Sequence, residues 1–504
     1  MTDNSYVKAN VNEKWIVESP AGANLEGGTR RDTVDTPSQE WYELEKERPL
    51  VRVLLGGTED MQAGGKKWLP VWEGEEGVEY KTRLSLSELV EFYAQACRGL
   101  VNKVFAKPLR LSDAPEKLEA WWDNVSRKKT ERSGSLYVRG RSLDSLSRGL
   151  GFTLVDFPKL SAPVEDAKQE EQQALAPYCK TIPPSCVIEW DEGVNDLGDV
   201  VLRRVRYADV QEVDSTDEWI KHYQPIVVVL ERGEGEGQPA TMQVHVREEG
   251  SRDFKHDPEQ DAAFEIPLKS KLGEIPAVRW ETGASGGEPI LYGLARLNLQ
   301  HYRKKSDFDH AVSISSQPMQ AYIGFSDDDM EGHQVGAYRY VNTTNDAAKV
   351  QDISFQYSGS AQIAMEDLSK LELHIARAAL DPQATKATGE EKATIRLIDE
   401  AKVSSQLQAW AAGWLDSAQE VLEWAGAWYG LEPEAVGTLS YLEEIFDSLK
   451  GESTFADFLS FAALFVVPPE VAIKEAQRFG VIGDEHDPED LARRMDVSAG
   501  EVEP

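Results

Sequence analysis

A serine in a glycine-rich stretch is the clearest candidate for nucleophilic chemistry in the sequence. Residues 283–287 read G-A-S-G-G and match the G-x-S-x-G pattern, in which a tight turn between a strand and a helix exposes the serine. Glu288 and Pro289 keep a helix from starting directly after that turn, and no alternation of strands and helices surrounds it. We therefore interpret Ser285 as a loop residue in a chance match.

Histidines and carboxylates show no arrangement that predicts a metal site or acid–base catalysis. His301 and His310 share one predicted helix, but nine residues make about two and a half turns and place them on opposite sides. The patterns of zinc peptidases and of phosphate-binding loops do not occur in the sequence. With 88 acidic residues, adjacent carboxylates are expected by chance. The sequence therefore predicts no catalytic residue, no metal and no cofactor.

The cysteines and the apolar runs predict an intracellular protein. Cys97, Cys179 and Cys186 form an odd, sparse set without C-x-x-C spacing, which favours reduced thiols over a disulfide framework or a zinc site. The first residues lack the apolar core of a signal peptide. The longest apolar run, 458–467, is shorter than the roughly 20 residues of a membrane-spanning helix.

Length and charge bound the kind of protein. A chain of 504 residues predicts two to four domains, and a hydrophobic content of 41% is enough for packed cores. The 54 basic and 88 acidic residues give a net charge of −34, which repels other copies and repels phosphate backbones. This argues against a conventional DNA-binding module, but it does not exclude a protein that must let DNA pass without gripping it.

The first half of the chain reads as an α+β domain behind a polar arm. Residues 1–48 predict a flexible arm with at most a short helix near 41–47. A helix is predicted from Ser85 to Phe105, with Ser85 and Glu88 as a capping box. An acidic insertion covers 165–175. Further helices are predicted over 115–126 and 141–151, and strands of an antiparallel sheet or its neighbours over 152–157, 186–190, 200–205, 219–230, 240–246 and 273–280.

The second half predicts helices around a small β-rich segment. A helix over 290–313 is followed by β-like residues 319–357, a second helix over 360–380 and a polar loop at 381–391. A helix over 392–429 would reach roughly 57 Å. Its face carries Trp410, Trp414, Trp424 and Trp428, which predicts packing and not a sugar-binding platform. The same order of elements also fits a helical bundle with a β-hairpin insertion.

One stretch resembles a known family. Gly273-Glu274-Ile275-Pro276 and the run L-A-R-L-N-L-Q-H-Y-R at 294–303 are similar to an I-P strand and an L-A-x-L-N-x-x-H-Y-R helix in one family of portal proteins of tailed bacteriophages. The resemblance extends over about 51–431. The further similar stretches are 68–108, 143–158, 388–394 and 424–430.

The resemblance implies a ring-forming α+β portal architecture made of a wing, a stem, a clip and a crown. In that architecture the arm before the wing and the crown after it vary widely. The implied parts are an arm at 1–48, a wing at 49–289, stem helices at 290–316 and 358–380, a clip at 317–357, a tunnel loop at 381–391, a long wing helix at 392–430, and a crown and tail at 431–504.

The function that the resemblance implies is a dodecameric channel at one capsid vertex, through which double-stranded DNA is packaged and later ejected. The implied partners are the terminase large subunit, the head–tail adaptor, and the major capsid and scaffolding proteins. Such a protein is assembled in the host cytoplasm and stays in the virion. It is not an enzyme, since the ATPase of the packaging motor lies in another protein.

The resemblance also assigns two groups of site residues. Lys386 and Lys392 could make weak phosphate contacts with passing DNA, or could simply solvate the loop. The implied tunnel-loop residues are Thr385, Lys386, Thr388, Gly389 and Lys392. The implied clip residues, which would dock the motor and the adaptor, are Tyr322, Phe325, Tyr338, Arg339 and Tyr340.

Two other functions remain open from the sequence. An acidic enzyme such as a glycoside hydrolase would use the many carboxylates and the 13 tryptophans. A scaffold or adaptor protein without a channel would need neither. Ring formation separates the portal from both of these alternatives, and hydrolysis of a glycan would favour the enzyme.

Overall fold

The computed structural model places most of the chain between residues 33 and 441. The arm before residue 33, the acidic insertion at 165–174 and the tail after 441 lie outside the described residues. The described residues are 33–158, 175–194, 198, 200–213, 222–235, 237–248, 251, 253–283, 286–315, 320–326, 345, 347–352, 358–380 and 391–441.

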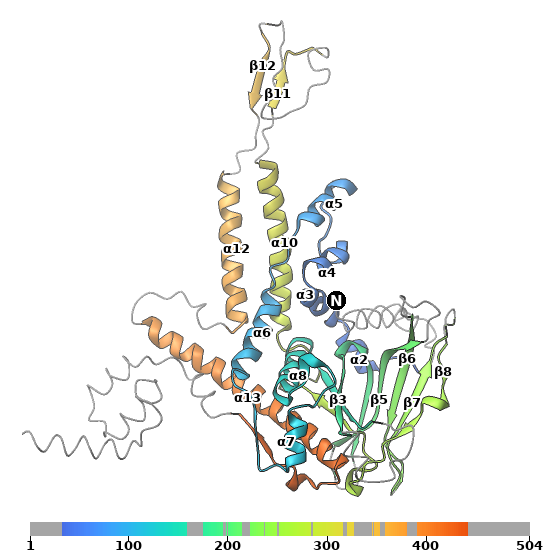
Figure 1. The fold of residues 1–504 in the computed structure, drawn as a ribbon. Coiled ribbons are helices and arrows are strands. Elements are labelled where there is room, and N and C mark those ends of the chain that lie inside the picture. Colours follow the sequence, from blue (N-terminus) through green and yellow to red (C-terminus); the bar gives the residue numbers. More distant parts are fainter. Residues whose placement is uncertain are drawn as a thin grey trace, which may run out of the picture.

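The molecule has a mixed helical and sheet body from which an arm projects (Figure 1). Helices α10 (Tyr292–Ser315) and α12 (Ser358–Ala378) lie side by side and form the arm. The antiparallel hairpin of β11 (Gln320–Ile323) and β12 (Lys349–Asp352) lies at its far end. Helix α13 (Glu391–Trp428) crosses the body near the base of the arm.

The body contains helices and strands from both ends of the described chain. Its other helices are α2 (Gln39–Leu44), α3 (Arg48–Gly56), α4 (Thr58–Ala63), α5 (Gly77–Leu86), α6 (Phe92–Val104), α7 (Glu116–Trp122) and α8 (Gly134–Arg148). Its strands are β1 (Arg110–Ser112), β2 (Gly151–Asp156), β3 (Tyr178–Ile182), β4 (Val187–Val194), β5 (Val200–Val213), β6 (His222–Glu231), β7 (Thr241–Val246), β8 (Lys255–His256), β9 (Ala262–Ala263), β10 (Ala277–Trp280) and β13 (Thr438–Ser440).

The main sheet is antiparallel, as the series of β-rich segments predicts. Its strands follow the order β4-β5-β6-β7-β8, and β9 also pairs with β7. The run Val227–Leu230 in β6 is buried on both faces, which explains its continuous apolar sequence. A second sheet, β10-β2-β3, uses the strand β3, which the sequence does not predict because its polar residues Lys180 and Thr181 interrupt the apolar pattern.

Tryptophan side chains fix α13 to the body. The indole Nε1 of Trp414 donates to Ser145 Oγ at 3.0 Å and to Thr282 Oγ1 at 3.1 Å, joining α13 to α8 and to the end of β10. Trp410 and Trp424 are buried as well. The predicted packing role of these tryptophans is therefore confirmed.

The chain after α13 returns to the body. Strand β13 pairs with β1 in an antiparallel ladder that joins Arg110 with Ser440. The amide of Gln419, on α13, accepts from Leu439 N at 2.9 Å and donates to the carbonyl of Gly437 at 3.0 Å. Residues up to 441 are thus part of the body, although the resemblance implies a crown from residue 431.

The predicted helix from Ser85 to Phe105 is wrong at its start. Helix α5 ends at Leu86 and α6 begins at Phe92, so Ser85 closes one helix instead of capping the next. Its hydroxyl donates to the carbonyl of Thr82 at 2.9 Å. The break forms because other elements take up its backbone groups: for example, Leu89 N donates to Thr58 Oγ1 at 3.1 Å.

The prediction of a flexible N-terminal arm over residues 1–48 is wrong for the last residues of that segment. Trp41 on α2 is buried against the main sheet. Arg206 on β5 donates to the carbonyl oxygens of Val34 at 2.7 Å and Thr36 at 2.9 Å, which holds residues 33–38 in place. Polar composition hides this contact, because one tryptophan and backbone carbonyls make it.

The other helices agree with the sequence, with shifted ends. Helix α8 begins at Gly134, seven residues before the predicted start at Arg141, because Ser133 caps it by accepting from Leu136 N at 3.4 Å. Helices α10, α12 and α13 match their predicted ranges within two residues. Among the residues placed by the structure, no helix is long and apolar enough to cross a membrane.

Candidate functional site

The two helices of the arm pack through a narrow apolar seam. On α12, Leu371 and Ile375 point into this seam near the body and are buried. Leu368 and Ala364, about one and two turns nearer the tip, are only partly covered. Burial therefore decreases from the root of the arm to its tip, and the outer half of the arm keeps much of its side-chain surface free in the single chain.

An ion pair and a histidine–carboxylate contact cross the same seam. Lys304 Nζ lies 2.5 Å from Asp367 Oδ2, and His301 Nε2 lies 3.2 Å from Glu372 Oε1. His301 is only 2% exposed and meets the ring of Phe92 edge-on at 5.0 Å. This histidine therefore has a structural position between α10, α12 and α6.

The root of the arm is held by a buried asparagine. Asn298 on α10 is fully buried, and its Oδ1 accepts from Tyr93 N at 3.0 Å. Its Nδ2 donates to the carbonyl of Val90 at 2.9 Å. Asn298 thus satisfies two backbone groups at the break before α6, and it fixes the position from which the arm leaves the body.

An arginine clasp binds α5 to the other side of α10. Arg83 donates to both carboxylate oxygens of Glu75 at 2.8 Å and to the carbonyl of Pro70 at 2.7 Å. Its guanidinium lies 4.1 Å from the ring centre of Trp72 and 3.5 Å from Asp307 Oδ1 on α10. The side chains of Arg83 and Glu75 are 2% and 3% exposed, so the pair is buried.

The clasp shifts the ionisation of its members. The hydrogen bonds from Arg83 lower the pKa of Glu75 below its ordinary value. Desolvation raises the pKa of Asp307, and the charge of Arg83 opposes this shift. His310 stands beside the clasp, with its ring 5.0 Å from that of Trp72. It lies across α10 from His301, as the nine-residue spacing predicts.

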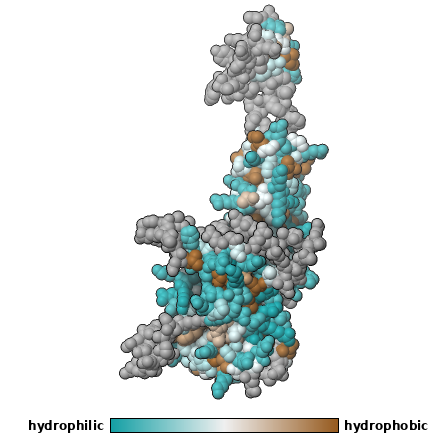
Figure 2. All heavy atoms as spheres, turned by 90° about the vertical axis from the view of Figure 1, so that its right-hand side faces the viewer, coloured by the Kyte–Doolittle hydropathy of each residue, from teal (hydrophilic) through white to brown (hydrophobic). Residues whose placement is uncertain are grey.

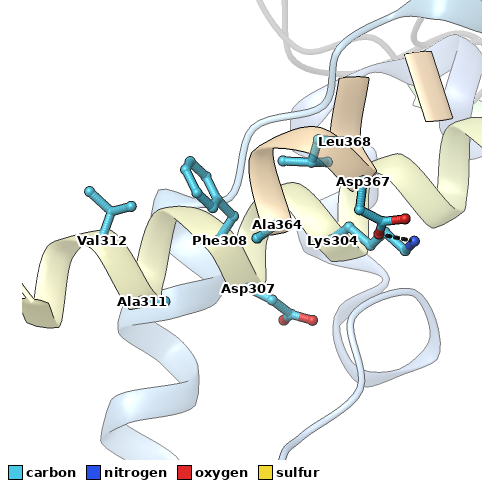
Figure 3. A pocket seen from close by; sticks show the side chains of 8 residues that line it. All are labelled: Lys304, Asp307, Phe308, Ala311, Val312, Ala364, Asp367 and Leu368. Carbon is cyan, nitrogen blue, oxygen red and sulfur yellow. Dashed lines mark hydrogen bonds and ion pairs between the residues drawn. The ribbon is translucent and has the colours of Figure 1, made fainter. Parts of the chain in front are cut away.

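A groove lies between α10 and α12 in the outer half of the arm (Figure 3). We call it the arm groove; its volume is about 280 Å³. Phe308 and Leu368 line it from the two helices, while Asp307 points to the opposite side of α10, toward the clasp. The other lining residues are Lys304, Ala311, Val312, Ala364 and Asp367.

Two of the predicted clip residues lie together at the tip. The rings of Tyr322 and Phe325 meet edge-on at 5.5 Å. Between them, Gly324 has a positive φ of 82°, and its carbonyl accepts from Asn345 Nδ2 at 2.7 Å. The other predicted clip residues, Tyr338, Arg339 and Tyr340, lie outside the described residues.

The structure describes little of the predicted tunnel loop. Lys392 lies in the first turn of α13. The other predicted loop residues, which lie outside the described part of the chain, are Thr385, Lys386, Thr388 and Gly389. Ser285 of the glycine-rich stretch also lies outside it.

Sequence reasoning missed the clasp and the arm groove. Both depend on contacts between residues far apart in the chain, such as Arg83 with Asp307, and no local spacing marks them. Between residues 33 and 441, outside the gaps given above, no group of three or more His, Cys, Asp or Glu side chains is arranged to hold a metal ion. The three cysteines are free and buried.

Comparison with known families gives one match. No curated protein matches the sequence. Residues 290–429 match a family described as a domain of unknown function, DUF4055. The match begins two residues before α10 and ends one residue after α13, so it spans the arm and the long helix. The range that is similar to this family therefore contains the whole arm.

Proposed function

We propose that the protein is a portal subunit: a member of a ring whose central channel passes double-stranded DNA at one vertex of a phage capsid. The observation that carries this proposal is the arm. Two helices hold a β-hairpin away from an α+β body, and a 38-residue helix follows them. This is the order of stem, clip, second stem and long wing helix that the sequence resemblance implies.

The anchoring of the arm supports a role in which the hairpin at its tip is held in a fixed position relative to the body. Asn298 fixes its root, and the Arg83 clasp supports α10 farther along its length. A hairpin held at this distance would present Tyr322 and Phe325 to a packaging motor and later to an adaptor. The partly uncovered seam near the tip leaves surface for neighbouring subunits.

The charge of the chain supports passage of DNA without tight binding. Each neutralised phosphate adds affinity and salt dependence, so a channel with many exposed cations would hold the DNA in place. A subunit with a net charge of −34 avoids this. The proposed ring has about a dozen copies and no catalytic activity of its own.

The burial of the tryptophans weakens the alternative of a glycoside hydrolase. A sugar platform needs exposed rings, yet Trp410, Trp414 and Trp424 are buried under the body. A scaffold protein without a channel keeps the same fold, and only the assembly state distinguishes it from a portal.

The decisive experiment is negative-stain electron microscopy of the full-length protein, with light scattering on the same sample. We expect rings with a central channel and a mass near a dozen copies of the 56.2 kDa chain. A monodisperse monomer at low salt, at high salt and with Mg²⁺ would contradict the proposal. Steady ATP hydrolysis by the pure protein would contradict the absence of catalysis.

A further inference from the structure

The arm exposes apolar side chains on two different sides. On the α5 side, Val78 is 76% exposed and Leu86 is 67% exposed. We call these two residues the α5 face. Figure 2 views the molecule from this direction and shows brown, apolar patches along the arm among hydrophilic surface. Isolated exposed apolar residues are ordinary, but a grouped set marks an interaction surface.

The α5 face is suited to burial. Val78 and Leu86 are eight residues apart and therefore about 80° apart around the helix, on one side. The hydroxyls between them are satisfied within the helix: Thr82 donates to the carbonyl of Val78 at 3.0 Å, and Ser85 donates to that of Thr82 at 2.9 Å. Covering this face would thus leave no hydroxyl donor without an acceptor.

The second surface is the arm groove. Val312, which lines it on α10, is exposed, and Ile363 and Met365, which flank the lining residue Ala364 in the sequence of α12, are 69% and 58% exposed. A cavity of about 150 Å³ admits a group the size of benzene, so a groove of about 280 Å³ has room for aliphatic side chains. At one end of the groove, Lys304 and Asp367 form an ion pair with each other.

The two surfaces lie at the same level of the arm. Asp307 borders the arm groove through its place on α10, while its carboxylate points away from the groove and pairs with Arg83 of α5 at 3.5 Å. Helix α5 lies on one side of α10, and α12 lies on the other (Figure 1). Copies arranged around an axis along the arm would therefore bring the α5 face of one copy against the groove side of the next. Such a contact joins two different patches and repeats around a ring.

Charge also favours a second copy as the occupant. Exposed Lys81 lies on the outer side of α5, close to Val78 and Leu86 in the helix. Asp367, with 54% of its side chain exposed, lines the groove and pairs with Lys304. Segment 64–86 carries four basic and four acidic residues, and α10 carries four basic and two acidic residues. The excess negative charge of the chain therefore lies outside segment 64–86 and α10, which lowers the repulsion between copies that meet along these elements.

We infer that the α5 face of each subunit docks against the arm groove of its neighbour, with Val78 and Leu86 as the inserted side chains. This inference rests on the proposed ring and names the surfaces that build it. The contact uses segments that are far apart in sequence within each chain, so every copy carries both halves.

Cysteine cross-linking of the full-length protein tests the contact. One variant combines Val78→Cys with Ile363→Cys, and a second combines Val78→Cys with Met365→Cys. The two α12 positions are about 200° apart around the helix, so a neighbour's α5 can reach only one of them. The three natural cysteines are buried and should react little. The matched control combines Val78→Cys with Val194→Cys, an exposed position at the end of β4.

With a short bis-maleimide, we expect one of the two double variants to give a ladder of covalent dimers, trimers and larger species. Each single variant and the control should stay at least tenfold less cross-linked. Rings by microscopy without a ladder from either double variant would overturn the docking inference and leave the proposed portal intact. Covalent ladders without rings would support the docking contact and count against the channel. A monomer that forms neither would refute both.

Discussion

At the scale of single residues, Arg83 is the most connected side chain of the arm support. It joins Glu75, Pro70 and Trp72 within its own segment to Asp307 on α10. Its guanidinium geometry allows two parallel hydrogen bonds to one carboxylate, which a lysine cannot reproduce. The position of α5, and with it the α5 face, therefore depends on this residue.

Replacing Arg83 should release α5 from α10. In Arg83→Ala the Glu75 carboxylate loses both hydrogen bonds from Arg83 and opens to water, and losing charge-assisted hydrogen bonds of this kind costs about 1–3 kcal/mol. We expect a loss of that size in the local opening free energy of α5, measured by hydrogen exchange. Lys255→Ala, which breaks an exposed pair with Glu248, is the control and should change stability by less than about 1 kcal/mol. Equal effects of the two substitutions would show that the clasp does not hold α5.

The same clasp predicts an acid-sensitive arm support. Because Arg83 lowers the pKa of Glu75 below 4.5, the ionised carboxylate stabilises the folded state above that pH. This stabilisation is lost as the pH falls through the lowered pKa. The difference in α5 opening free energy between wild type and Arg83→Ala should therefore shrink below pH 4.5, after correction for intrinsic exchange. A difference that stays constant down to pH 3 would exclude this linkage.

At the scale of elements, the arm depends on the junction between α10 and α6. Asn298 supplies one acceptor and one donor to backbone groups of Val90 and Tyr93. The junction replaces the helical hydrogen bonds that a continuous helix from Ser85 would have made. The orientation of the arm therefore depends on Asn298, which in the sequence looks like an ordinary polar residue of an amphipathic helix.

Removing this side chain should loosen the root of the arm. Asn298→Ala leaves two buried backbone groups unsatisfied, at about 1–3 kcal/mol each. We expect hydrogen-exchange protection of the first turn of α6 to fall by a corresponding amount. Asn102→Ala is the control, since Asn102 accepts only from exposed Arg139. If both variants exchange alike, the root is held by other contacts.

The elements also show what a sequence can predict and what it cannot. The sequence predicts α10, α12 and α13 because each is a long run without a helix-breaking proline, and in α13 the apolar residues recur at three- and four-residue steps. Periodicity misses the break at 87–91 because Leu86, Leu89 and Val90 keep the helical spacing while tertiary hydrogen bonds take over the backbone. It misses β3 because burial of that strand comes from partners in the second sheet. The clasp and the arm groove are likewise products of distant contacts.

At the scale of the whole molecule, charge governs assembly. Copies with a charge of −34 repel one another over roughly 10 Å at 0.1 M salt and over about 30 Å at 0.01 M. We expect the ring population to rise with NaCl between these concentrations, and to rise further with millimolar Mg²⁺. Light scattering across a salt series measures it. Assembly that weakens as salt rises would indicate that ion pairs, not apolar surface, dominate the contact.

The ladder between β1 and β13 has a consequence for how the nascent chain folds. Arg110 pairs with Ser440, which is made 330 residues later, so this contact has a very large sequence separation. At synthesis rates of about 5–20 residues per second, the ribosome needs roughly 15–65 s to make the intervening chain. Until α13 has been made, Ser145 and Thr282 lack the indole of Trp414, and the surface of the body that α13 covers stays exposed. A chain truncated before α13 should therefore bind chaperones or aggregate, whereas one that reaches residue 441 can close its body.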